Sequence, residues 1–176
     1  INLNPGAYSV FSTAQLAYLG NGNYAHGNVY NAYLYNNDAR SYIANAIGGS
    51  GNDVITGNAA DNTLTGGAGS DTLEGGGGHD TLIGGTGADT FVFGAHDGVT
   101  TVMDFFHSQG DQILLSGIAG VSNFTDVLSH ASQTGADTTL DFGSSEQIIL
   151  HNVSLSSLTA GDFQFKEAAP PVQITN

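Results

Sequence analysis

Residues 48–92 repeat with a period of nine, and this period constrains the fold more than any other feature of the chain. The five consecutive copies read GGSGNDVIT, GNAADNTLT, GGAGSDTLE, GGGGHDTLI and GGTGADTFV. The sixth position is always Asp or Asn, and the eighth is a large apolar residue: Ile55, Leu64, Leu73, Leu82 and Phe91. A flexible glycine-rich linker needs neither position. A dinucleotide-binding loop needs a preceding strand and a following helix, which this pattern does not indicate.

The chemistry of one copy predicts a parallel β-roll. Its glycines suit tight turns with positive φ, and its last three residues suit a short strand whose central side chain points inward. Two consecutive copies then complete one coil, and stacked coils align Asp53, Asp71 and Asp89 in one column and Asn62 and Asp80 in another. We expect an all-β protein in which this roll packs with flanking antiparallel strands as a β-sandwich.

The two acidic columns predict bound calcium. Carboxylates one coil apart, at about 4.8 Å, repel by roughly 3 kcal/mol at an effective dielectric constant near 20. One apolar side chain per copy is too thin a core to offset this repulsion and the entropy cost of ordering many glycines. Carboxylate and carbonyl oxygens are the ligands that calcium prefers. Each ion is therefore expected to bridge two turns of one column: 48–53 with 66–71, 57–62 with 75–80, and 66–71 with 84–89.

The repeat resembles the calcium-binding nonapeptide of the RTX proteins. The resemblance implies that the sixth-position side chain and the carbonyls of the second and fourth positions hold calcium. The implied ligands are Gly49, Gly51, Asp53, Asn58, Ala60, Asn62, Gly67, Gly69, Asp71, Gly76, Gly78, Asp80, Gly85, Gly87 and Asp89. The second copy lacks the glycines of the second and fourth positions and the Asp, so its site should be weaker.

Two aspartates after the repeat, Asp104 and Asp111, flank a predicted turn at 107–110. The resemblance implies that they ligate a further calcium that closes the roll, whereas the residues alone are equally compatible with turn or cap roles. Together the sites predict several calcium ions, roughly three to five. His96 and Asp97 are expected to form an irregular sixth turn.

The flanking segments extend the resemblance. The phrases INLNPGAYS and ANAIGGSGNDVITGNAADN are similar to the C-terminal calcium-binding domain of serralysin-type secreted metalloproteases. The pattern L-x-x-L-x-x-x-D-F-x-F near the end also resembles RTX modules of secreted alginate epimerases. We divide the chain into an N-terminal flanking β segment with a Tyr-rich insertion, the RTX β-roll, a C-terminal capping β region and a tail or linker, at 1–47, 48–93, 94–165 and 166–176.

Local patterns within these segments predict individual elements. Residues 1–4 and 29–35 are expected to be strands, 123–131 a short helix with Phe124, Val127 and Leu128 on one face, and 138–142 and 147–151 a hairpin. The chain opens inside a predicted strand without Met, so we expect a fragment or processed product of a longer protein.

Composition narrows the partners. The chain has 16 acidic and 2 basic residues, a net charge of −14, which disfavours nucleic acid and anionic membranes. It contains no cysteine, so disulfides and thiolate metal sites are excluded. It contains no apolar run of the length that a membrane-crossing helix needs, so no membrane span is predicted.

No catalytic motif is evident in this stretch of sequence. It contains neither His-Glu-x-x-His nor G-x-S-x-G, and its six histidines share no ligand spacing. Asp141 and Glu146 are the remaining acidic pair, in an expected exposed hairpin. We predict a non-catalytic calcium-binding domain of a secreted, extracellular bacterial protein. It would fold on calcium after type I export by an ABC exporter, and it would stabilise an attached catalytic or adhesive domain.

The alternative is an extracellular polysaccharide- or peptide-binding module with structural calcium. It rests on the tyrosines of the insertion, which can stack on a ligand, although packing within strands is the more common use of such residues. These tyrosines are Tyr24, Tyr30, Tyr33, Tyr35 and Tyr42.

Overall fold

The computed structural model describes residues 1–4, 8–9, 18–20, 23–24, 29–30, 42–143 and 145–167. The four short strands before residue 42 form two antiparallel pairs: β1 (Tyr8–Ser9) with β4 (Val29–Tyr30), and β2 (Tyr18–Gly20) with β3 (Asn23–Tyr24). The expected strand at 29–35 is therefore described only at its first two residues. The strand expected at 1–4 is reduced to one parallel bridge between Asn2 and Thr56.

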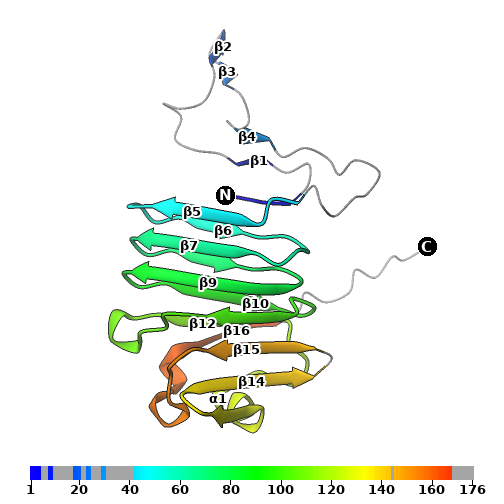
Figure 1. The fold of residues 1–176 in the computed structure, drawn as a ribbon, viewed down its shortest axis with the longest axis vertical. Helices are drawn as coiled ribbons and strands as arrows, with labels where there is room; N and C mark the ends of the chain where they lie inside the picture. Colours follow the sequence, from blue (N-terminus) through cyan, green and yellow to red (C-terminus); the bar gives the residue numbers. More distant parts are fainter. Residues whose placement is uncertain are drawn as a thin grey trace, which may run out of the picture.

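The nonapeptides form the predicted parallel roll, whose strands stack in two sheets (Figure 1). The first, third and fifth copies give β6 (Val54–Thr56), β8 (Thr72–Glu74) and β10 (Thr90–Gly94), which pair in parallel. The second and fourth copies give β7 (Thr63–Ala68) and β9 (His79–Thr86), preceded in the same sheet by β5 (Asn45–Gly49). Ile55 is opposite Leu73, which is opposite Phe91, so the expected coil of two nonapeptides is confirmed.

The eighth positions form the centre of the core. Ile55, Leu64, Leu73 and Leu82 are fully buried, and Phe91 is 2% exposed. Full burial of one such side chain stabilises the fold by roughly 1.5–3 kcal/mol. Ala46 on β5 lies opposite Leu64, so inward packing begins one strand before the first complete copy.

The C-terminal region extends both sheets of the roll. β12 (Gln112–Ser116) and β16 (Phe163–Lys166) continue the sheet of β10, in parallel. β11 (Val99–Val102) and β15 (Glu146–Leu150) continue the sheet of β9 in parallel, and β14 (Asp137–Gly143) and β13 (Ala131–Thr134) then add antiparallel strands. The predicted all-β roll with flanking antiparallel strands, and the predicted hairpin, are thus confirmed.

Short helical segments connect these strands. The expected helix is α1 (Phe124–Ser129), whose N-cap Asn123 accepts a hydrogen bond from the Asp126 amide. Val127 is buried and Phe124 packs against the core, but Leu128 is 43% exposed. The predicted apolar face was therefore wrong at Leu128, because Phe124 and Val127 form the inward side of this short helix. The 3-10 turns are η3 (His107–Gln109), η4 (Leu155–Ser157) and η5 (Ala160–Asp162).

The coil lengthens where the roll meets this cap. Val102 on β11 lies opposite Leu82, so this coil is two positions longer than a pair of nonapeptides. Ile113 on β12 lies opposite Phe91, and this coil is four positions longer than such a pair. The extra residues enter the turns before β11 and β12, so these two turns keep the stacking of the roll while departing from its sequence.

Candidate metal centres

The structure brings the sixth-position side chains together in two columns. The Asp53 amide donates to Asp71 Oδ1 at 2.8 Å, and the Asp71 amide donates to Asp89 Oδ1 at 2.8 Å. The Asp89 amide donates to Asp111 Oδ1 at 3.0 Å, so Asp111 continues this column beyond the repeat. In the other column the Asn62 amide donates to Asp80 Oδ1 at 2.8 Å. One oxygen of each of these carboxylates therefore faces the preceding coil.

The second oxygen of the repeat aspartates has no partner. The Oδ2 atoms of Asp53, Asp71, Asp80 and Asp89 are buried without a hydrogen-bond donor, and Asp71, Asp80 and Asp89 are no more than 2% exposed. A buried charged group without a partner costs several kcal/mol. Four such atoms in regular positions fit a cation that the protein surrounds with oxygen.

Backbone carbonyls of the following coil lie beside these oxygens. A Cβ built on Gly48 would lie 2.5 Å from Asp53 Oδ2 and 2.4 Å from the Gly66 carbonyl oxygen. A Cβ on Gly66 would lie 2.2 Å from Asp71 Oδ2 and 2.7 Å from the Gly84 carbonyl oxygen. The sequence analysis did not single out these first-position carbonyls, although the first position is Gly in all five copies.

The carbonyls predicted from the second and fourth positions point toward the next coil. The Gly49 oxygen lies 2.2 Å from a Cβ built on Gly67, and the Gly51 oxygen lies 2.6 Å from one built on Gly69. The same close approach between successive coils recurs in both columns, and it leaves no room for a side chain on the second of the two residues. It involves Asn58 with Gly76, Ala60 with Gly78, Gly67 with Gly85 and Gly69 with Gly87. Which of these carbonyls ligates an ion stays a prediction.

The second copy is built differently. Asn62 Oδ1 accepts the Asn58 amide at 2.7 Å and lies beside the Gly75 carbonyl, at the place where the aspartates have Oδ2. Asn62 Nδ2 donates to the carbonyls of Ile43 at 3.3 Å and Ala44 at 3.2 Å. Hydrogen bonds thus satisfy this side chain without an ion, which supports the expectation that the pair 57–62 with 75–80 is weaker.

Each carboxylate oxygen of the two aspartates after the repeat accepts one backbone amide. Asp104 Oδ1 and Oδ2 accept the Gly84 and Gly85 amides, each at 2.8 Å. Asp111 Oδ2 accepts the Phe106 amide at 2.8 Å, and its Oδ1 accepts the Asp89 amide. Both side chains therefore organise the turn over the fifth copy. Their role as ligands of a further calcium stays a prediction.

Burial makes the carboxyl groups of Asp80, Asp89 and Asp111 resist ionisation when no cation is near. Burial raises the pKa of Asp80 to about 7, and the charges of Asp61 and Asp97 act in the same direction. Burial also raises the pKa of Asp89 and of Asp111, with Asp104 adding repulsion to both. The calcium-free roll would therefore hold protons on groups that are ionised in water.

The donor set is one of hard oxygens. Among the described residues, no group of three or more His, Cys, Asp or Glu side chains is arranged to hold a metal. Four of the five repeat turns instead offer one sixth-position carboxylate and several carbonyls, and the second copy offers the amide of Asn62. This set matches calcium and lacks the nitrogen and sulfur ligands that zinc prefers.

The described histidines lie at the surface or in turns, as expected, and His26 lies outside the described residues. His107 Nδ1 contacts Asp162, whose Oδ2 also caps η5 through Thr159. Glu146 is half-buried rather than exposed, because it accepts the His96 amide at 2.7 Å. Asp141 is exposed, as expected for the hairpin.

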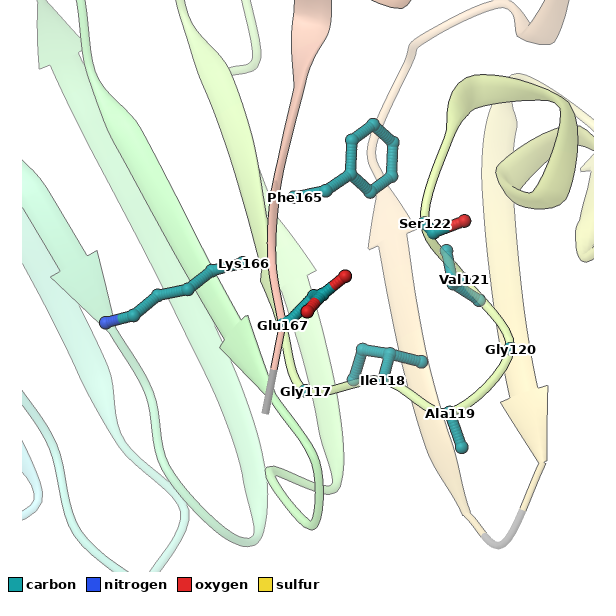
Figure 2. Close-up of a pocket in the computed structure, with 9 residues that line it drawn as sticks. All are labelled: Gly117, Ile118, Ala119, Gly120, Val121, Ser122, Phe165, Lys166 and Glu167. Carbon is teal, nitrogen blue, oxygen red and sulfur yellow. The ribbon is translucent and has the colours of Figure 1, made fainter. Parts of the chain in front are cut away.

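A pocket of about 530 Å³ lies between the loop 117–122 and the end of β16 (Figure 2). Lys166 extends away from the loop, and the Ser122 hydroxyl donates to Asp126 in the cap of α1. The Ser122 hydroxyl at this pocket therefore has a structural partner. No helix in the described part of the chain is long and apolar enough to span a membrane.

Comparison with known families identifies the repeat. A hemolysin-type family model, the RTX calcium-binding nonapeptide repeat in four copies, matches residues 45–73 and 65–95. Residues 45–95 are RTX calcium-binding repeats. The match begins at β5, in agreement with the inward packing of Ala46.

Two solved structures are similar to the chain. One is an extracellular lipase of Serratia marcescens, with 29% identity over 69% of this chain and a TM-score of 0.47; the match spans 21% of the lipase. The other is a subunit of the Azotobacter vinelandii mannuronan C5-epimerase, with 23% identity, 65% of this chain, 78% of that subunit and a TM-score of 0.28. No curated protein matches the chain.

Proposed function

We propose that this chain is a non-catalytic RTX domain whose folding is driven by calcium and which stabilises a larger secreted protein. The observation that carries the proposal is the set of four buried Oδ2 atoms without a partner, on Asp53, Asp71, Asp80 and Asp89. For Asp53 and Asp71, this atom lies beside a backbone carbonyl oxygen of the following coil. Calcium between successive turns supplies the positive charge that these atoms lack.

The ions belong between turns of the same column. Asp53 and Asp71 would each contribute Oδ2 toward the following coil, where the Gly66 and Gly84 carbonyls lie. Carbonyls of the second and fourth positions, directed toward the same gap, complete the oxygen donors. Because these donors come from two coils, an ion binds only when the coils are stacked.

Binding to the folded state alone couples calcium to folding. A site with a dissociation constant of about 0.1 mM contributes roughly 1.4 kcal/mol at about 1 mM calcium, and several sites add. At the far lower calcium of a cytosol the carboxylate repulsion is unopposed. An unfolded chain suits passage through a type I exporter, and extracellular calcium would then fold the domain beside its attached catalytic or adhesive partner.

A calcium titration followed by far-ultraviolet circular dichroism tests the proposal. We expect little β signal in excess chelator and a cooperative rise at submillimolar to millimolar calcium. Magnesium at the same concentration is the control for ionic strength, and it should act weakly because it demands a smaller octahedral site. A full β signal in excess chelator would refute calcium-driven folding.

A further inference from the structure

The turn before β11 stacks on the repeat although its sequence, GAHDG, does not match it. Gly98 has φ of +77°, and a Cβ there would lie 2.3 Å from the Gly78 carbonyl oxygen. The same contact joins Gly69 to Gly51 at 2.6 Å and Gly87 to Gly69 at 2.0 Å within the roll. The Val99 amide also donates to the Gly78 carbonyl at 2.9 Å. Residues 94–98 are therefore the next turn of the second column.

This turn lacks the sixth-position aspartate. The residue opposite Asp80 in the parallel register is Thr100, which is 3% exposed and carries no charge. Asp80 nevertheless has a buried Oδ2 without a partner. That atom lies 2.3 Å from a Cβ built on Gly75, the relation that Asp53 and Asp71 have to their own first glycines. In those two turns, Oδ2 lies beside the following coil, so Asp80 directs an unsatisfied oxygen toward 94–98.

Asp97 brings a carboxylate to the same turn. Its Oδ2 accepts a hydrogen bond from the Gly94 amide. Its charge acts on Asp80, and it is itself surrounded by the charges of Glu74 and Glu146. His96 is the one described group whose charge favours ionised Asp97, and its side chain is 93% exposed. The turn thus adds a carboxylate whose charge acts on Asp80, the residue with the buried oxygen that has no donor.

We propose that the fourth-copy turn and residues 94–98 form a further calcium site, with Asp80 and Asp97 as its carboxylate ligands. Asp97 takes the place of the repeat aspartate that Thr100 does not supply. The inference rests on the proposed calcium-dependent function and adds a site that the repeat pattern omits. Because β11 begins at Val99, an ion at this site would link the turn before β11 to the turn of the fourth copy, and so stabilise the pairing of β11 with β9.

The test counts bound calcium by native mass spectrometry of the full chain at saturating calcium. Asp97→Asn should bind one ion fewer than the parent protein. Asp141→Asn is the matched control, because Asp141 is exposed and also accepts a nearby amide, that of Gly143 at 2.9 Å. It should bind the parent number of ions. Adding Thr100→Asp to Asp97→Asn should restore the lost ion.

The outcomes separate the two proposals. A parent protein that binds no calcium refutes the proposed function and this site together. A parent that binds calcium, with an unchanged count in Asp97→Asn, refutes only the site at 94–98. Circular dichroism at saturating calcium shows whether each variant is folded. If Asp97→Asn fails to fold at saturating calcium, both alone and combined with Thr100→Asp, the site is also refuted. Neutralising one carboxylate in this turn should leave the other sites able to fold the roll.

Discussion

Asp71→Asn should make the roll less dependent on calcium. Asp71 is the central member of its column, with Asp53 one coil before and Asp89 one coil after. The substitution keeps the shape of the side chain and the Oδ1 atom that accepts the Asp53 amide. It removes one charge and places an amide NH₂ beside the Gly84 carbonyl oxygen. In the second copy the Asn62 amide is turned the other way, and its Nδ2 donates to the carbonyls of Ile43 and Ala44 in the preceding coil.

The expected effect without calcium is a gain in stability. At about 4.8 Å and an effective dielectric constant near 20, each neighbouring carboxylate repels Asp71 by roughly 3 kcal/mol. Removing both repulsions gives an upper bound of roughly 6 kcal/mol, and proton uptake and salt reduce it. With calcium bound, Asp71→Asn should instead be less stable than the parent, because the ion between 66–71 and 84–89 loses a carboxylate ligand.

The assay is far-ultraviolet circular dichroism against free calcium at pH 8, where the carboxylates of the unfolded chain are ionised. Asp71→Asn should show more β signal than the parent in chelator and a shallower calcium response. Asp141→Asn is the control, because Asp141 is exposed, lies in the hairpin beyond the roll and accepts one amide, from Gly143 at 2.9 Å. If Asp71→Asn has no more β signal in chelator than the parent, carboxylate repulsion is not what keeps the calcium-free roll unfolded.

Three further predictions concern packing, backbone and pH. Leu73→Ala should lower the free energy of unfolding in calcium by about 2–5 kcal/mol, because Leu73 is fully buried. Val54→Ala, at a side chain that is 62% exposed, should change this free energy by about 0.5 kcal/mol or less. Urea unfolding in the presence of calcium measures both changes. Gly67→Ala should raise the calcium concentration at the folding midpoint far more than Gly49→Ala. Gly67 has φ of +116°, and a Cβ added there would lie 2.2 Å from the Gly49 oxygen, whereas nothing lies within 4 Å of a Cβ added on Gly49. Equal midpoints would contradict the stacking described above. Calcium-free protein should have more β signal at pH 5 than at pH 8. The pKa of Asp80 rises from its ordinary 3.8 to about 7 on folding, which gives the calcium-free fold a stabilisation that is fully present below pH 3.8 and lost as the pH rises through 7; an unchanged spectrum between the two pH values would contradict this linkage.

Much of the roll was predictable because its order is local. Each nonapeptide carries its own turn glycines, its inward residue and its acidic position, so a fixed period alone implies parallel stacking and two columns. The register of Ile55, Leu73 and Phe91 confirms this inference. The hairpin of β14 and β15 and the helix α1 were also predictable, since their signals lie within a few residues of each other.

The contacts between coils were less accessible. The first-position carbonyls of Gly66 and Gly84 lie beside Asp53 and Asp71 only after the coils are stacked. Similarly, Glu146 was expected to be exposed but contacts His96, which is far away in sequence. Periodicity identifies which residues repeat, but it does not say which backbone oxygens of the next coil face them.

The sequence by itself determined the coil of two nonapeptides, the inward apolar positions and the acidic columns, because each depends on residues at a constant spacing. The tertiary structure decided how the columns end. The two longer coils place Thr100 opposite Asp80 and Ile113 opposite Phe91, and the Asp89 amide then meets Asp111. No local pattern encodes these lengths, since they arise from the packing of the longer turns and the cap strands on the last coils of the roll.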